Sequence, residues 1–73
     1  MEPYKPSPSD ITWLRNLIEL LKEGGVWGIP RSGGVFTFYK ESKEYTYLGN
    51  REHQADTRTI TILAELGWKE RKA

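Results

Sequence analysis

The chain has 73 residues, and its eleven basic and ten acidic residues leave a formal net charge of +1. A chain of this length builds one small hydrophobic core, and its near-balance of charge argues against a protein that binds nucleic acid mainly by neutralising phosphates. The absence of cysteine excludes disulfides and thiolate metal sites.

Residues 1–7 are predicted to form a flexible arm, because two X-Pro bonds favour extended backbone there. A helix is predicted to begin after Ser7, with Pro8 at its first position and Asp10 completing a capping box. We expect Gly24 to end it as a left-handed cap. The apolar residues of this helix recur at helical spacing: Ile11, Leu14, Leu17, Ile18 and Leu21.

Residues 26–30 and 35–40 are rich in β-branched and aromatic side chains, which favours two strands around a turn at Ser32 and Gly33. This turn predicts a register with four core side chains on one face of the sheet: Ile29 opposite Phe36, and Trp27 opposite Phe38.

A third strand is predicted at residues 44–48, after a loop at residues 41–43. We favour the register in which Lys40 faces Glu44, because it pairs opposite charges. Leu48 then joins the core face, and the opposite face carries three tyrosines: Tyr39, Tyr45 and Tyr47. A shift by one residue would exchange the faces of Leu48 and of the last two tyrosines. Lys43 counts against the favoured register, because such a loop often needs a positive φ there.

Residues 57–66 are predicted to form a second helix capped by Asp56, although their β-branched content also suits a strand. Gly67 should end this helix, and Trp68 should pack back on the core. The predicted fold class is α+β, with the order helix, three-stranded antiparallel sheet, helix. We expect one domain at residues 8–68 and a charged, frayed tail at residues 69–73.

Catalytic chemistry is not expected. His53, the single histidine, lies in a polar loop without an evident nucleophile or metal partner, so a solvated role is predicted. Ser32 lacks the Gly-x-Ser-x-Gly elbow of an activated serine. No spacing of carboxylates with the histidine suggests a metal site, so we predict no metal, no cofactor and no enzymatic activity.

A binding surface is the more promising feature. The three tyrosines of the second sheet face are the residue type enriched in interface hot spots. In the alternative interpretation, the last predicted helix covers this face through Ile60 and Leu63, and the tyrosines are not exposed. A charged rim is expected from nearby basic residues: Arg31, Lys40, Lys43 and Arg58. The basic residues of the tail are predicted to be solubilising: Lys69, Arg71 and Lys72.

Three segments of the chain resemble small proteins encoded by tailed bacteriophages: DITWLRNLIELLKEGG at residues 10–25, VWGIPRSGGVF at residues 26–36, and LGW at residues 66–68. In size and character the chain is similar to the phage proteins that bind and reprogram the host's RNA polymerase.

This resemblance implies a monomer in the bacterial host cytoplasm that binds an RNA polymerase subunit without catalysis and inhibits or modifies transcription. A cytoplasmic location also agrees with the polar N-terminus and the lack of a long apolar run. The expected contact residues are Arg31, Tyr39, Tyr45, Tyr47 and Arg58, with Tyr4 and Lys5 of the arm folding against the partner.

Two alternatives remain open. An aromatic sheet face with basic neighbours also suits single-stranded nucleic acid, and the first hairpin could serve as the wing of a winged-helix protein. The second alternative is an antidefence inhibitor of another host protein. The salt dependence of the binding affinity distinguishes the nucleic-acid alternative from the others, because binding driven by phosphate contacts weakens steeply with added salt.

Overall fold

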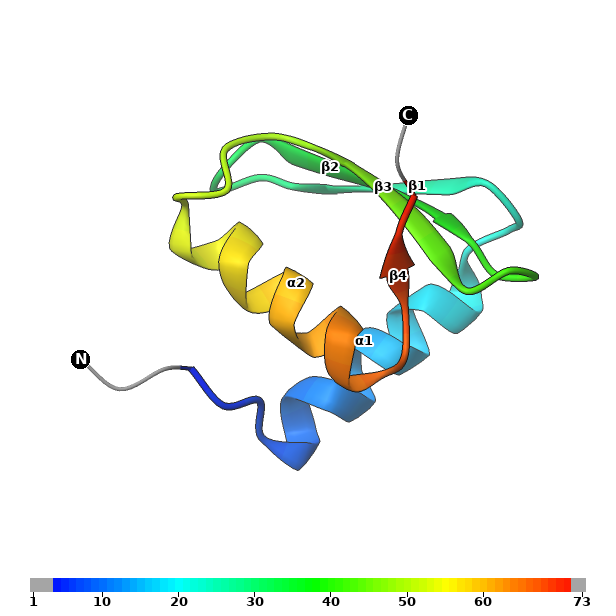
Figure 1. The fold of residues 1–73 in the computed structure, drawn as a ribbon, viewed down its shortest axis with the longest axis horizontal. Coiled ribbons are helices and arrows are strands. Elements are labelled where there is room, and N and C mark those ends of the chain that lie inside the picture. The colour runs from blue at the N-terminus through cyan, green and yellow to red at the C-terminus, as the bar shows by residue number, and fades with distance from the viewer. Residues whose placement is uncertain (1–3, 72–73) are drawn as a thin grey trace.

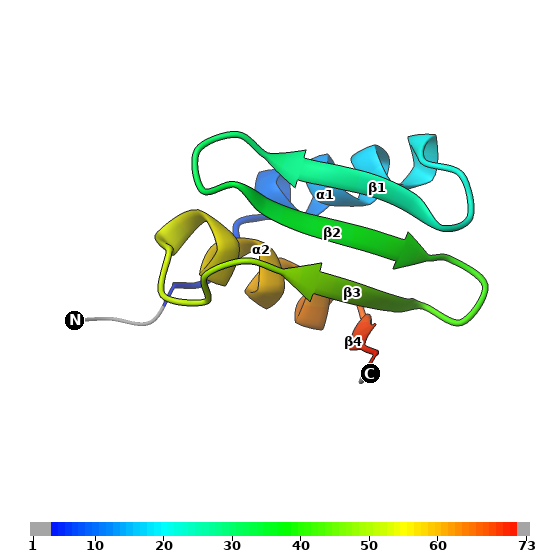
Figure 2. The same cartoon turned by 90° about the horizontal axis from the view of Figure 1, so that it is seen from above.

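The computed structural model describes residues 4–71 as two helices and a four-stranded mixed sheet of order β1-β2-β3-β4. The elements are α1 (Pro8–Leu20), β1 (Gly25–Ile29), β2 (Gly34–Tyr39), β3 (Glu44–Leu48), α2 (Gln54–Glu65) and β4 (Lys69–Glu70). Both helices lie against the same face of the sheet, and no described element covers the other face (Figures 1 and 2). The predicted α+β class is confirmed. The predicted sheet of three antiparallel strands is extended by a fourth strand, β4, which is parallel to β3.

Helix α1 begins as its capping residues predict. The Ser7 hydroxyl accepts a hydrogen bond from the Asp10 amide at 3.2 Å, and the Asp10 carboxylate accepts one from the Ser7 amide at 3.3 Å. This capping box satisfies amides that the first helical turn leaves without partners. The helix ends at Leu20, earlier than predicted, and Gly24 adopts the left-handed conformation (φ +72°) just before β1.

The register between β1 and β2 differs by two residues from the predicted one. Trp27 pairs with Phe36 and Ile29 with Gly34, because the connecting turn contains four residues rather than two. Gly33 closes this turn in the left-handed region (φ +73°), and its amide donates to the Ile29 carbonyl at 2.8 Å. A shift of two residues preserves the face of every side chain, so the predicted aromatic core still forms.

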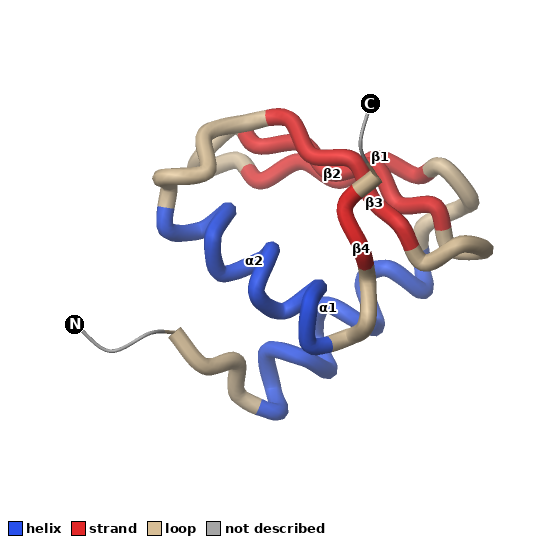
Figure 3. Tube along the Cα trace, viewed as in Figure 1, coloured by secondary structure: helices blue, strands red, loops and turns tan. Residues whose placement is uncertain are grey.

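The favoured register between β2 and β3 is wrong, and the alternative is found. Phe38 pairs with Tyr45 and Phe36 with Tyr47, so both tyrosines lie on the core face. Figure 3 shows the strands, in red, on one side of the two helices, in blue. Tyr45 is only 4% exposed, whereas Leu48 is 78% exposed. Two tyrosine rings bury more apolar surface than one leucine, and that gain outweighs a single surface charge pair.

The turn between β2 and β3 explains how this register forms. It spans Lys40 to Lys43, and Lys43 adopts the positive φ of 54° that was expected to disfavour a lysine. Lys40 does not pair with Glu44, whose cross-strand partner is Tyr39. Instead the Lys40 ammonium donates to the Glu19 carbonyl in the last turn of α1 at 2.9 Å, where a helix dipole favours a cation.

Helix α2 confirms the helical interpretation of residues 57–66, although it begins earlier. Its N-cap is His53, whose Nδ1 accepts from the Ala55 amide at 3.2 Å, and not Asp56. The β-branched content is tolerated because Thr59 and Thr61 donate to carbonyls one turn earlier, both at 2.9 Å. Gly67 follows the helix with a φ of +86°.

The first two residues of the predicted frayed tail, Lys69 and Glu70, instead form β4, which runs parallel to β3. The Lys69 amide donates to the Lys43 carbonyl at 3.0 Å, and the Arg71 amide to the Tyr45 carbonyl at 2.7 Å. Trp68 packs edge-on against Phe38, with ring centroids 5.5 Å apart, as predicted. The rest of the predicted tail, residues 72–73, lies outside the described residues.

The core lies between the helices and the sheet. Its buried hydrophobic residues come from every element except β4: Leu14, Ile18, Ile29, Phe36, Phe38, Tyr45, Ile62 and Leu63. Within residues 4–71, neither helix is long and apolar enough to cross a membrane.

Helix α1 provides a matched test of this core. Leu14 is 0% exposed and Leu20 is 87% exposed. We expect Leu14→Ala to lower the free energy of unfolding by about 2–5 kcal/mol, because it leaves a cavity between the layers. Leu20→Ala should change the free energy of unfolding by less than about 0.5 kcal/mol. Urea denaturation measures both, and equal effects would contradict the assigned helix face.

Candidate functional site

A cleft of about 600 Å³ opens between α1, α2 and the turn that joins β1 to β2. Apolar and small side chains of β1 and α2 form part of its lining, among them Ile29, Ala55 and Ile62. We call it the Trp–Arg cleft, after the residues that give it its chemistry: Trp13, Trp27, Arg31 and Arg58. Its volume falls within the range of roughly 300–1,000 Å³ typical of ligand-binding pockets.

Two tryptophans connect the cleft to the core. Trp13 on α1 is 50% exposed and meets Trp27 of β1 edge to face, with ring centroids 5.7 Å apart and an interplanar angle of 71°. The ring centroid of Trp27 in turn lies 6.0 Å from that of Phe36, which is fully buried. The exposed indole is therefore held by a rigid aromatic contact, while half of its surface stays open to a ligand.

A second set of side chains in the cleft comes from the segment before α1 and from α2. The Tyr4 hydroxyl donates to the Asp10 carboxylate at 2.6 Å, and the Arg58 guanidinium lies 5.1 Å from the centroid of the Tyr4 ring. Burial, together with this hydrogen bond, raises the pKa of Tyr4 to about 12. The hydrogen bond from the Tyr4 hydroxyl, and then the one from the Ser7 amide, lower the pKa of Asp10. Its carboxylate is therefore charged, and it already accepts two hydrogen bonds from the protein.

The turn that carries Arg31 is anchored by a buried carboxylate. Asp56, in the first turn of α2, is 0% exposed and accepts hydrogen bonds from the hydroxyls of Ser32 and Tyr47. Ser32 also accepts from the Gly34 amide at 3.1 Å. One side chain thus joins α2 to the β1–β2 turn and to β3, which fixes the backbone beside Arg31.

The close packing around the Asp56 carboxylate explains why glycine occupies positions 34 and 49. A Cβ on Gly34 would collide with the Asp56 carboxylate, and a Cβ on Gly49 would stand 2.7 Å from the Tyr47 hydroxyl and 2.9 Å from Asp56. Both positions therefore require a residue without a side chain. The Ser-Gly-Gly run combines a hydrogen-bonding hydroxyl, the left-handed Gly33 and the close approach at Gly34.

In the described part of the chain, the two arginines of the cleft have no ion pair, which they share with the exposed Arg15 of α1 but not with Arg51 and Arg71. Arg51 forms an ion pair with Glu70, and Arg71 forms one with Glu44 at 3.2 Å. Among residues 4–71, neither Arg31 nor Arg58 has a carboxylate within ion-pair distance. Within the described residues, the cleft therefore presents two cationic side chains that form no direct ion pair, although Arg58 is near enough to Asp10 to help lower its pKa.

Three of the predicted contact residues come together here. Arg31, Arg58 and Tyr4 line the same cleft. Lys5, also predicted from the arm, is exposed and does not line it. Residues 1–3 of the predicted arm lie outside the described residues.

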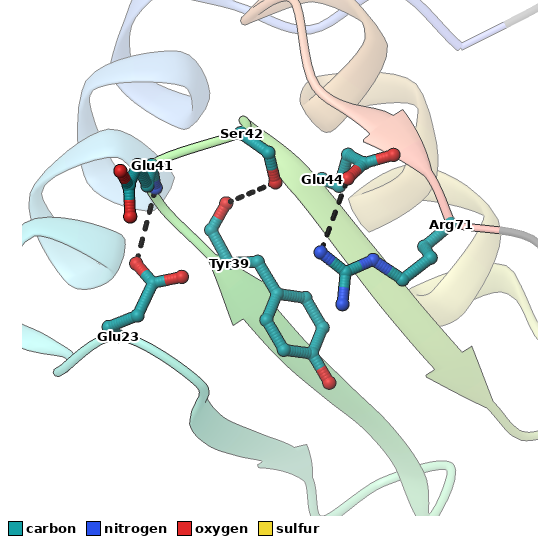
Figure 4. A network of polar contacts seen from close by, with 6 residues as sticks. All are labelled: Glu23, Tyr39, Glu41, Ser42, Glu44 and Arg71. Carbon is teal, nitrogen blue, oxygen red and sulfur yellow. Dashed lines mark hydrogen bonds and ion pairs between the residues drawn. The ribbon is translucent and has the colours of Figure 1, made fainter.

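The predicted platform of three tyrosines does not form. Tyr45 and Tyr47 lie on the core face because they pair with Phe38 and Phe36. Tyr39 remains on the outer face, where the Arg71 guanidinium lies 3.8 Å from its ring centroid and also pairs with Glu44 (Figure 4). The predicted rim residues Lys40 and Lys43 do not line the cleft either.

Sequence reasoning missed two residues that define the site. Trp13 lies beside the apolar stripe of α1, three residues after Asp10, and that helical spacing could have placed both on one edge of the helix. Asp56 matched a helix cap, and no local signal distinguishes that role from a buried anchor for a turn 24 residues earlier.

The surroundings of the candidate catalytic and metal-ligating residues can be described for residues 4–71. Within residues 4–71, no three histidine, aspartate or glutamate side chains gather as metal ligands. His53 uses its Nδ1 to cap α2, and the Ser32 hydroxyl donates to Asp56 without a histidine between them. This geometry suits anchoring the turn and does not match a nucleophile activated by a base.

Comparison with protein-family models, with curated proteins and with solved structures gave no match to this chain. Its function is therefore inferred from the chemistry of the cleft and from the sequence resemblance.

The buried anchor can be tested by Asp56→Asn, which replaces one hydrogen-bond acceptor by an amide donor facing two hydroxyls. We expect the free energy of unfolding to fall by about 1–3 kcal/mol, because buried polar groups lose their partners. Glu52→Gln, in the exposed loop before α2, should change it by less than about 0.5 kcal/mol. Thermal or urea unfolding measures both, and an Asp56→Asn protein as stable as the parent would contradict the anchor.

A titration in alkaline solution tests the same contact. Burial, together with the hydrogen bond to Asp56, raises the pKa of Tyr47 from 10.0 to about 12. The folded state therefore holds the phenol proton more tightly than the unfolded chain. The resulting stability is complete below pH 10 and is lost as the pH rises toward 12.

Ultraviolet absorbance of the phenolate provides the measurement. Tyr47→Phe should remove one tyrosine from the transition near pH 12, and Asp56→Asn should lower the pKa of Tyr47 toward 10. The hypothesis fails if Tyr47 already titrates near its ordinary value of 10.0 in the folded parent protein.

Proposed function

We propose that this protein is a non-catalytic binding domain that acts stoichiometrically on a protein partner through the Trp–Arg cleft. The observation that carries this proposal is the half-exposed Trp13, held edge-on by Trp27 beside two arginines that form no ion pair among residues 4–71. Tryptophan, tyrosine and arginine are the residues that most often dominate the binding energy of protein interfaces.

The cleft has the dimensions of an anchor site within a larger interface. Its volume of about 600 Å³ accommodates one or two side chains of a partner. A standard interface buries about 800 Å² on each partner, so the surrounding surface of α1 and of the first turn would supply the remaining contacts. Such an interface regulates its target by occupancy and needs no cofactor or chemical step.

We propose a bacterial RNA polymerase subunit as the partner, on the strength of the resemblance to phage regulators in the WGIPRSG segment at residues 27–33. Binding of this protein to the polymerase subunit would inhibit or modify host transcription. The segment includes four lining residues of the cleft, Trp27, Ile29, Pro30 and Arg31, and the anchoring Ser32.

One form of the nucleic-acid alternative, an aromatic sheet face on which bases stack, loses support, whereas the winged-helix form stays a prediction. The stacking form depended on tyrosines that stack bases on an open sheet face, and Tyr45 and Tyr47 are turned into the core. The basic residues Arg51 and Arg71 are paired with acids of the same chain.

Purified RNA polymerase and the wild-type protein should form a complex that survives nuclease treatment. We expect Trp13→Ala to weaken it about 30-fold or more, the effect of losing a hot spot worth about 2 kcal/mol. Arg31→Glu should also weaken it, because it reverses a charge at the edge of the cleft. Surface-immobilised binding measurements give the affinities.

Leu48→Ala is the matched control, since Leu48 is exposed on the outer face of the sheet and lies outside the cleft. Its affinity should equal that of the parent. Partner binding that survives Trp13→Ala and Arg31→Glu but is lost in Leu48→Ala would assign the interface to the outer face instead. Failure to retain the polymerase would remove this partner from the proposal.

A further inference from the structure

We infer that the Trp–Arg cleft recognises an acidic peptide segment of its partner, in which an apolar side chain lies against Trp13 and a neighbouring carboxylate binds Arg31 or Arg58. This inference rests on the proposed function and specifies the chemistry of the ligand.

The charges of the cleft are the first support. Its ionised lining residues are Arg31, Arg58 and Asp10, so two cations and one anion leave an excess of one positive charge. The anion is already engaged, because the Asp10 carboxylate accepts hydrogen bonds from the Tyr4 hydroxyl at 2.6 Å and from the Ser7 amide at 3.3 Å. The net field of the cleft therefore favours a ligand that brings its own negative charge.

The positions of the two arginines strengthen this argument. Arg58 is held with its guanidinium 5.1 Å from the centroid of the Tyr4 ring, which limits the side-chain entropy lost on binding. Arg31 lies in the turn that Asp56 anchors through Ser32. A guanidinium binds a carboxylate through two parallel N–H donors, so either arginine can orient an acidic side chain.

The apolar part of the ligand follows from the two tryptophans. Trp13 is half exposed and Trp27 half buried, and Ile29 and Ile62 line the same cleft. An aromatic or aliphatic side chain placed there would cover indole surface that now contacts water. Such burial gains about 25 cal/mol for each Å² of apolar surface.

A polypeptide fits this combination better than a nucleic acid does. A nucleic-acid strand carries a phosphate on every nucleotide and needs a track of cations along its path. Only two unpaired arginines line the described cleft, and Arg51 and Arg71 are already held by acids. An acidic peptide needs one or two cations beside an apolar pocket, as found here.

Three capped tripeptides test the inference in titrations of the whole protein followed by NMR. The first is glutamyl-phenylalanyl-glutamate, the second replaces both glutamates by glutamine, and the third replaces phenylalanine by alanine. The indole N–H signals of Trp13 and Trp27 report binding in the cleft, and the remaining amide signals show that each variant is folded.

We expect the acidic phenylalanine peptide to shift both indole signals and to bind about tenfold more tightly than its glutamine counterpart, which lacks the charges. The alanine peptide should be weaker still. The double variant Arg31→Gln, Arg58→Gln should abolish the preference for the acidic peptide. Arg15→Gln, an exposed arginine of α1 that does not line the cleft, should preserve it.

Equal affinity for the acidic and glutamine peptides, or shifts that avoid both indoles, would overturn the inference. An oligothymidine that shifts the indoles at lower concentration than any peptide would overturn it in favour of nucleic acid. These results are distinguishable from failure of the proposed function. If Trp13→Ala abolishes polymerase binding while the peptides show no charge preference, the inference alone fails; if Trp13→Ala leaves that binding intact, the proposed function fails.

Discussion

A single buried carboxylate holds together the segments on which the cleft depends. Asp56 lies in the first turn of α2, and its partners Ser32 and Tyr47 lie 24 and 9 residues earlier in the chain. A charged group removed from water is costly unless its acceptor positions are used, and here two hydroxyls use them. The geometry of the first turn, the face of Tyr47 and the position of α2 are therefore coupled through one side chain.

This coupling has a consequence for recognition. Arg31 follows Pro30 in a turn that Asp56 joins to α2 through Ser32, and α2 also carries Arg58 into the cleft. Trp13 is held separately, by its edge-to-face contact with Trp27 and through it with the buried Phe36. Aromatic and cationic groups of the site are thus positioned before a ligand arrives, which lowers the entropy lost on binding.

Local signals in the sequence were sufficient for both helices and the first three strands, although not for β4. The capping box of Ser7 and Asp10, the apolar spacing of α1 and the alternation of β1 and β2 each depend on neighbouring residues. The registers were not predictable in this way, because each depends on the length of a turn. The second register also required Lys43 to accept a positive φ so that two tyrosines could be buried. The same error hid the role of Asp56 as an anchor, since it placed Tyr47 on the outer face, away from Asp56.

The central claim is that the protein meets its partner at Trp13 and not on the open face of the sheet. Incorporating a photo-crosslinking benzophenone amino acid at position 13, and separately in place of Leu48, tests this claim in bacterial cells. A protein crosslink that forms from position 13 and is absent from position 48 would support it, and mass spectrometry would identify the partner and the contacted segment. A crosslink from position 48 alone, or a nucleic-acid adduct from position 13, would contradict it.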